Sequence, residues 1–341
     1  MSEVKQSVNQ LQIVGTLSEM NFEMKEKEVE LKKDGKVVKK VTCKVIGKKE
    51  FKNPNLTVEV VRPDGSETLI GVTFNNGFDT NEKTLDKDGK VIDNKRFKAL
   101  ETIMGYITKA KSTEENPATR VKVDCSLNAN EYVGQDEEFK SYPNINAFQC
   151  TSSGVPEEDI ADGRISVIIR SIIDETVGED AKETGRLKVE AYSFDYNKHA
   201  IPHSFFVEAD LADDFRDFYE RGDSCKLYYE VVSKHVGAKK QKSSGGFGRR
   251  EEKITSGFTV TEYSIFKGDE KFEEENEYFI SIKDMKTAME DREIMIENMK
   301  EKAKEKGSKP SAKKEEKKGL GSRPSKADFK DIEDSDSDFP F

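Results

Sequence analysis

Hydrophobic and polar residues alternate along most of this chain in short, bounded runs, the pattern of β-strands. In the first half, β-branched and apolar runs predict strands at 11–17, 37–46 and 68–74, followed later by strands at 119–133 and 144–153. Between these two groups, apolar residues recur at three- and four-residue spacing over 96–111, which predicts a helix. Asp-Gly pairs at 34–35, 64–65 and 88–89 mark hairpins or loops.

The second half repeats this order of elements. Strands are predicted at 163–174, 185–196 and 201–210, a short amphipathic helix at 211–222, and strands at 224–236 and 254–266. Three strands, a helix and two strands is the order of the OB-fold, a five-stranded Greek-key barrel that binds oligonucleotides or oligosaccharides. We therefore expect a mainly β protein with two tandem OB-fold-like barrels. The alternative is a pair of β-barrels that serve only as spacers.

The C-terminal part has a different composition. Apolar residues at three- and four-residue spacing predict a long helix over 278–307, interrupted by Arg292. We expect it to pack on its own barrel, and a partner-binding helix is the alternative. From residue 306 onward Lys, Gly, Ser and Pro dominate, which predicts a disordered linker and tail. The predicted parts are a first barrel (1–155), a second barrel (160–270), a helical extension (272–305) and a tail (306–341).

Charge is distributed unevenly along the 341 residues. The net charge is −10, but residues 327–341 alone carry −5 and residues 300–318 carry +5. No apolar run approaches the ~18 residues that a membrane span needs, and the first residues contain no signal-peptide core. We expect an intracellular, cytoplasmic protein.

Few residues suggest metal or catalytic chemistry. The cysteines Cys43, Cys125, Cys150 and Cys225 lie far apart, which predicts buried thiols without disulfides or zinc. His199 and His203 flank a predicted strand with Pro202, so they are not expected to bind a metal. The sequence also lacks a Walker loop and a recognisable catalytic triad. We expect a protein with no cofactor, no metal and no enzymatic activity; an OB-containing nucleic-acid enzyme is the alternative.

Aromatic and basic residues of the second barrel predict contacts with a nucleic-acid strand. Sequence-tolerant recognition of single strands requires cations along the phosphates and rings on which bases stack. Strand alternation places one group of rings and lysines opposite the core-facing side: Lys188, Tyr192, Phe194 and Tyr196 in one strand, and Lys226, Tyr228 and Lys234 in another. Each ring could instead belong to the core.

The segment between the last two predicted strands, residues 237–253, is basic and glycine-rich. It has a net charge of +4, and its candidate strand-contacting residues are Lys239, Lys240, Lys242, Phe247, Arg249 and Arg250. A solvated hairpin tip is the alternative. The corresponding segment of the first barrel is acidic, which makes that barrel the weaker candidate unless Tyr132, Tyr142 and Phe148 stack bases.

The chain ends in "DIEDSDSDFPF", an acidic run with phenylalanines at the tip. An acidic run alone is usually a solvated tail, whereas a partner with a basic-rimmed apolar pocket would use both carboxylates and rings. "DSDSDFPF" resembles the acidic C-terminal tip of bacterial single-stranded DNA-binding proteins, with Phe339 where an aliphatic residue usually stands. Two barrels in one chain also depart from the usual one-barrel subunit.

This resemblance implies binding of single-stranded DNA without catalysis, in DNA replication, recombination and repair, and a phage protein fits it. It also implies that the tip recruits replication and recombination proteins, through Asp331, Glu333, Asp334, Asp336, Asp338, Phe339, Pro340 and Phe341. A second copy of the chain is a further candidate partner. An RNA-binding or scaffolding OB adaptor is the main alternative, because stacking surfaces serve RNA and DNA alike.

Overall fold

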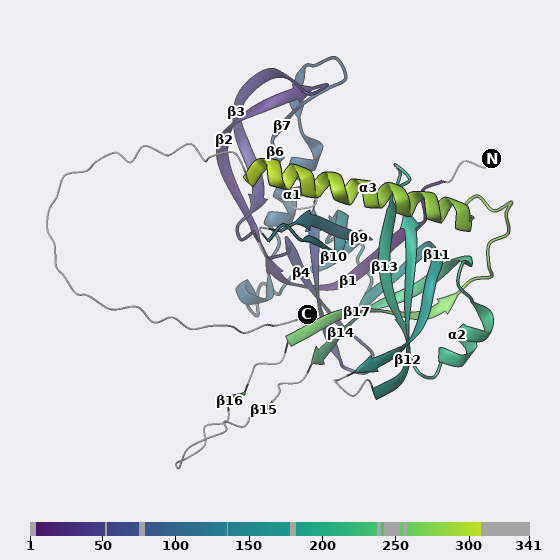
Figure 1. Ribbon diagram of the computed structural model, residues 1–341. Helices are drawn as coiled ribbons and strands as arrows, with labels where there is room; N and C mark the ends of the chain where they lie inside the picture. Colours follow the sequence, from purple (N-terminus) through teal and green to yellow (C-terminus); the bar gives the residue numbers. More distant parts are fainter. Residues whose placement is uncertain are drawn as a thin grey trace, which may run out of the picture.

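The computed structural model describes residues 5–51, 53–74, 79–134, 136–177, 182–236, 240–241, 253–254 and 258–307. Strands dominate this part of the chain, which also contains three α-helices. Figure 1 shows two β-barrels side by side, with the longest helix lying along both. The prediction of a mainly β protein with two OB-type barrels and a C-terminal helix is confirmed.

Barrel 1 contains five strands: β1 (Asn9–Met20), β4 (Leu56–Val61), β5 (Glu67–Phe74), β9 (Arg120–Val133) and β10 (Phe139–Thr151). β1 pairs antiparallel with both β4 and β9, and the barrel closes through a parallel pairing of β5 with β10. Helix α1 (Lys95–Met104) lies between the third and fourth strands and buries Phe97, Leu100 and Ile103. This is the OB order of elements.

Barrel 1 carries an insertion that the sequence pattern did not separate from the barrel. β2 (Phe22–Lys33) and β3 (Lys36–Lys48) form a long hairpin, which β6 (Thr80–Asn81) extends into a small sheet. A second small hairpin joins β7 (Lys83–Leu85) and β8 (Val91–Asp93). The strand predicted at 37–46 is therefore part of the insertion, and the second barrel strand is β4, which was not predicted.

The helix predicted at 96–111 is shorter than expected. α1 ends at Met104, where the Gly105 N–H donates to the Thr102 carbonyl and the Tyr106 N–H donates to the Ile103 carbonyl. A 3-10 turn η2 (Lys109–Lys111) follows. The Ile107 N–H donates instead to the Thr119 hydroxyl just before β9 (2.9 Å). The apolar spacing continues through residue 107 because these residues still face the barrel, although the backbone is no longer helical.

Barrel 2 follows the prediction closely. Its strands are β11 (Ile160–Val177), β12 (Lys182–Phe194), β13 (Ala200–Val207), β14 (Ser224–Val236) and β17 (Phe258–Gly268), with α2 (Ala212–Phe218) between β13 and β14. β11 pairs with β12 and β14, and β13 pairs parallel with β17. Two short strands, β15 (Lys240–Gln241) and β16 (Lys253–Ile254), pair with each other between β14 and β17.

The two barrels repeat each other in strand register as well as in order. In barrel 1, Leu11 lies opposite Cys125, which lies opposite Ala147. In barrel 2, Gly163, Tyr229 and Ile265 occupy the same places. Both barrels have β-bulges at equivalent positions of the first and last strands.

The barrels join through their first strands. β1 and β11 pair antiparallel with Leu11 opposite Gly163, so an approximate two-fold axis passes through this pair. Gly163 is required here, because a Cβ atom would lie 2.3 Å from the buried Tyr229 ring. The pairing unites β10, β9, β1, β11, β14 and β17 into one continuous sheet whose inner face holds the shared core.

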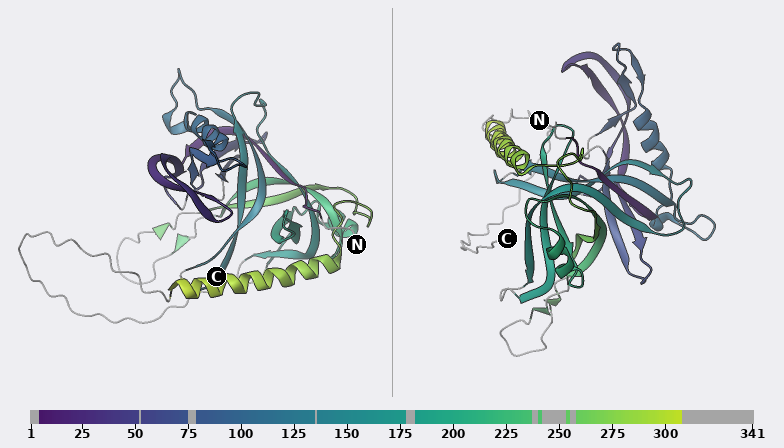
Figure 2. Two further views of the ribbon diagram at one scale, coloured as in Figure 1. Left: turned by 90° about the horizontal axis from the view of Figure 1, so that it is seen from above. Right: turned by 90° about the vertical axis from the view of Figure 1, so that its right-hand side faces the viewer.

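Helix α3 (Ile282–Gly307) packs across both barrels (Figure 2). Met285 and Ala288 of α3 form a small core with residues of barrel 2, among them Tyr192 and Phe194. The guanidinium of Arg292 forms a two-pronged ion pair with Glu131 of β9, with Nη1 3.0 Å from Oε2. The prediction that this helix packs on its own barrel is confirmed, and the charge that interrupts its apolar spacing ties it to the other barrel.

Candidate nucleic-acid interface

Two of the predicted base-stacking rings are buried. Tyr192 and Phe194 at the end of β12 are 6% and 3% exposed. They do lie on the opposite side of β12 from Leu187 and Val189, as alternation predicts, but Met285 of α3 and its neighbours cover them. The expectation that these rings lie on an open surface is therefore wrong in this structure, because the helix supplies a second apolar layer.

The other two predicted residues of this strand region are accessible. Lys188 is 41% exposed and its Nζ lies 3.3 Å from Glu190 on the same strand. Tyr196 is 77% exposed. It lies in the turn between β12 and β13, which Asp195 organises by accepting the N–H groups of Asn197 and His199. Tyr196 is thus an exposed ring held at the end of a rigid hairpin.

Lys226 and Tyr228 form one cluster on the outer face of β14. The Lys226 ammonium lies 2.9 Å from Asp269, and the Tyr228 hydroxyl donates to the same carboxylate at 3.1 Å. The hydrogen bond that Lys226 donates to Asp269 raises the pKa of this lysine. Lys267 Nζ lies 5.0 Å from the Tyr228 ring centroid, a cation–π distance. A half-buried ring and two ammonium groups therefore meet here.

The basic segment 237–253 occupies the position between the fourth and fifth strands of barrel 2. Lys240 opens β15 and pairs with Ile254 of β16, so this short ribbon lies between β14 and β17. Lys239, Lys242, Phe247, Arg249 and Arg250 lie outside the described residues, as do the acidic tip residues 331–341, and so does the side chain of Lys234 in β14.

The structure adds a pair of rings at equivalent bulges of the two barrels. Phe148 of β10 and Phe266 of β17 are 61% and 46% exposed. They line an open hollow of about 560 Å³ at the junction of the barrels, together with Tyr228 and Arg164. Arg164 donates from Nε to Gln10 Oε1 at 2.8 Å. The sequence offered Phe148 as a stacking candidate, but Phe266 was missed because a β-bulge leaves no mark in the alternation.

The same sheet face carries two further rings of barrel 1. Tyr132 and Tyr142 are 43% and 52% exposed, and their rings stack with centroids 6.2 Å apart. All three rings of barrel 1 that the sequence offered for base stacking are thus at the surface.

Burial shifts the pKa values of two side chains, His203 and Cys150, away from their ordinary values. His203 is buried with its Nε2 2.7 Å from the Ser193 hydroxyl, and burial lowers its pKa to about 3. Burial raises the pKa of the Cys150 thiol to about 12. No group of three or more His, Cys, Asp or Glu side chains in this part of the chain is arranged to hold a metal ion. No helix among the described residues has the length and apolarity needed to cross a membrane.

Comparisons with known proteins find two similar solved structures and one matching family. The chain is similar to the crystal structure of the wild-type single-stranded DNA binding protein from Thermus aquaticus, with a TM-score of 0.39 and 10% identity over 80% of this chain and 96% of that one. A deletion mutant of the same protein gives the same score and identity over 80% and 98%. No curated protein matches the chain. A sequence model of the YorF family matches residues 7–302, which include both barrels and most of α3, and the chain therefore belongs to the YorF family.

Proposed function

We propose that this protein binds single-stranded DNA without sequence preference and without catalysis. The observation that carries the proposal is the basic segment between β14 and β17. In an OB barrel the face of the second and third strands and the loops after the first and fourth strands contact oligonucleotides. Segment 237–253, with its net charge of +4, occupies the loop after the fourth strand of barrel 2.

The accessible rings and cations suggest how a strand is held. Bases stack on Tyr196 and Phe247, with Tyr228 as a further platform, and each stack contributes ~1–3 kcal/mol. The ammonium and guanidinium groups of the basic segment, with Lys188, contact phosphates and release counterions, which makes affinity salt-dependent. Tyr192 and Phe194 lie under α3 and take no part while the helix is in place.

A charge-neutralising variant tests this proposal. Replacing Lys239, Lys240, Arg249 and Arg250 by Gln should weaken binding to an oligo-dT and reduce the salt dependence. Each lost phosphate contact lowers the slope of log K against log salt by ~0.7, so complete loss of the four contacts lowers it by about 3. An unchanged slope would overturn the assignment of the segment to DNA. RNA and duplex DNA of equal length, titrated in parallel, distinguish a single-stranded DNA binder from an RNA-binding adaptor.

We also propose that the acidic tip recruits proteins of phage replication, recombination and repair. Support comes from the sequence "DSDSDFPF" at the end of a long polar segment. Deleting residues 333–341 should abolish recruitment and leave DNA affinity equal or higher, because negative charges that compete with phosphates are removed. The gain should be largest at low salt. A pull-down in which Phe341→Ala keeps every partner of the wild type would return the tip to a solubility role.

A second copy of the chain is the further partner that we propose, docked on the outer sheet face at the barrel junction. Phe148 and Phe266 lie at equivalent positions about the two-fold axis, and exposed rings on a shared sheet face suit a self-complementary interface. Sedimentation of a variant with Phe148→Glu and Phe266→Glu should show loss of the dimer. A wild-type protein that sediments as a monomer at all concentrations would refute this.

A further inference from the structure

The β2–β3 hairpin of barrel 1 is the most basic described element of the protein. Residues 22–49 carry ten lysines (Lys25, Lys27, Lys32, Lys33, Lys36, Lys39, Lys40, Lys44, Lys48 and Lys49) and five acidic residues (Glu23, Glu26, Glu28, Glu30 and Asp34), a net charge of +5. This excess is hidden in the overall charge of −10.

More than half of these lysines form no ion pair with the residues that the structure describes. Lys25, Lys27 and Lys40 form ion pairs at 2.5–3.1 Å with Glu23, Asp79 and Glu30. Six lysines form no ion pair with any described residue: Lys36, Lys39, Lys44, Lys48 and Lys49 on β3 and just after it, and Lys33 at the end of β2, whose ammonium donates instead to the Lys87 carbonyl. All residues from 32 to 40 are exposed. The hairpin therefore presents a run of ammonium groups that the fold itself does not neutralise.

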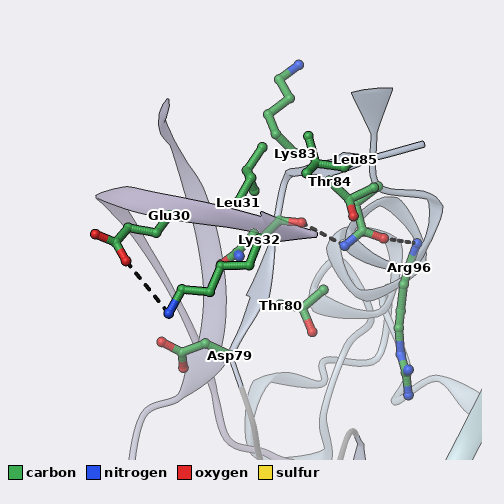
Figure 3. Close-up of a pocket in the computed structure, with 11 residues that line it drawn as sticks. Glu30, Leu31, Lys32, Asp79, Thr80, Lys83, Thr84, Leu85 and Arg96 are labelled. Atoms are coloured by element: carbon green, nitrogen blue, oxygen red, sulfur yellow. Dashed lines mark hydrogen bonds and ion pairs between the residues drawn. The ribbon is translucent and has the colours of Figure 1, made fainter. Parts of the chain in front are cut away.

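The hairpin is nevertheless a firmly held element. Its base packs into the main core through the buried Ile46, with Phe22 and Met24 against the same core, and β6 adds a third strand by pairing Val45 with Asn81. Near its outer end an open pocket of about 380 Å³ is lined by Lys32, Lys83 and Arg96 among others (Figure 3). Figure 3 shows Lys32 facing Glu30, while Lys83 and Arg96 extend away from this pair. The lysines are thus displayed on a preformed scaffold.

The position of the hairpin in the order of barrel strands suggests a role in ligand binding. It lies between β1 and β4, the first and second strands of barrel 1, where OB barrels place one of their ligand-contacting loops. Barrel 2 has only residues 178–181 between the equivalent strands β11 and β12. Figures 1 and 2 show the hairpin projecting away from both barrels. The two repeats thus differ at the loop after their first strands.

We infer that the β2–β3 hairpin is a second phosphate-binding arm for the same DNA strand that barrel 2 holds. Lys44 and Lys48, which form no ion pair with a described residue, share one side of β3 with Lys40, which pairs with Glu30. Four residues of a strand span ~13 Å. A flexible phosphate backbone can follow such a row of charges. This inference rests on the proposed function. It gives barrel 1 a contact with DNA, although the acidic segment of that barrel made it the weaker candidate in the sequence. Figure 1 places the hairpin and the β15–β16 ribbon at different ends of the molecule, so a strand must be long to touch both.

Neutralising the unpaired lysines tests the inference. In the full chain, Lys36, Lys39, Lys44 and Lys49 are replaced by Gln. The matched control replaces Lys283, Lys286, Lys300 and Lys302, which are exposed on α3, and so removes the same charge elsewhere. With a long oligo-dT of ~35 nucleotides, the hairpin variant should lower the salt slope by up to about 3, and the control by less than 1. With ~10 nucleotides, within the ~4–16 that one OB barrel holds, both variants should bind alike.

The outcomes separate this inference from the proposed function. If the wild-type chain binds no single-stranded DNA, the proposed function fails. If the wild type binds and the hairpin variant matches the α3 control on the long oligonucleotide, the hairpin is not a DNA arm. The Arg version of the hairpin variant keeps the charges and should restore the slope. If the four-site Gln variant fails to fold, Lys36→Gln with Lys39→Gln at the exposed end gives the same comparison with half the expected change.

Discussion

Replacing Arg292 by Ala should loosen α3 from the barrels. Arg292 and Glu131 are only 13% and 15% exposed, and their two-pronged pair joins the helix to barrel 1, where the guanidinium also lies over the Phe139 ring. Removing one partner of a buried pair costs about 3–5 kcal/mol, because the other charge stays buried without compensation. The residual exposure of both groups reduces this to about 2–4 kcal/mol.

Native-state hydrogen exchange measures this cost directly. The amides of α3 should exchange with an opening free energy about 2–4 kcal/mol lower in the variant than in the wild type. Glu131→Ala should act similarly, and the combination of Arg292→Met with Glu131→Leu should recover most of the loss, since apolar residues of similar size replace buried pairs well. Opening energies within 0.5 kcal/mol of the wild type in Arg292→Ala would refute the view that this pair fastens the helix.

Three further changes probe the core, the pH dependence and the barrel junction. Tyr192→Ala should lower the free energy of unfolding by about 3–5 kcal/mol in chemical denaturation, because the ring is buried. Tyr196→Ala should leave it unchanged, because that ring is exposed. Equal losses in the two variants would contradict this explanation. Burial lowers the pKa of His203 to about 3, below its unfolded value, so its contribution to stability should be complete above pH 6.5 and lost as pH falls toward 3. A His203→Gln variant should therefore show a flatter profile of unfolding free energy against pH than the wild type. Gly163→Ala should destabilise the protein by at least about 1–3 kcal/mol, seen as a lower Tm, because the added methyl group would overlap a buried ring; an unchanged Tm would mean that the ring can move aside.

Period-two alternation predicted barrel 2 nearly element by element, because its first three strands follow one another through short connections with no inserted sheet between them. The same pattern failed in barrel 1 where the chain leaves the barrel. The buried residues Cys43, Val45 and Ile46 give β3 the apolar pattern of a barrel strand, but β3 pairs with β2 and β6 instead. Nothing in its sequence says which sheet it joins. β4 (Leu56–Val61) is short, and its sequence was not predicted as a strand next to the longer apolar run at 37–46.

The candidate site shows the same limit. Alternation identifies the side of β12 that carries Tyr192 and Phe194, but it cannot say what lies against that side. Contact with α3 decides their burial, and α3 is distant in sequence. Phe266 lies in a bulge, whose location depends on pairing with β14. The positive charge of the β2–β3 hairpin is visible in the sequence. It did not suggest a binding element, because residues 37–46 were predicted to be a strand of the barrel itself.

A salt-dependent titration of the full chain tests the central claim most directly. Fluorescence anisotropy would follow binding to a labelled ~35-nucleotide oligo-dT, a mixed-sequence strand and a duplex of equal length at several salt concentrations. The account predicts similar affinity for both single strands, much weaker binding to the duplex, and a linear fall of log K with log salt corresponding to several phosphate contacts. Tighter binding to the duplex, or affinity for single strands that does not change with salt, would contradict it.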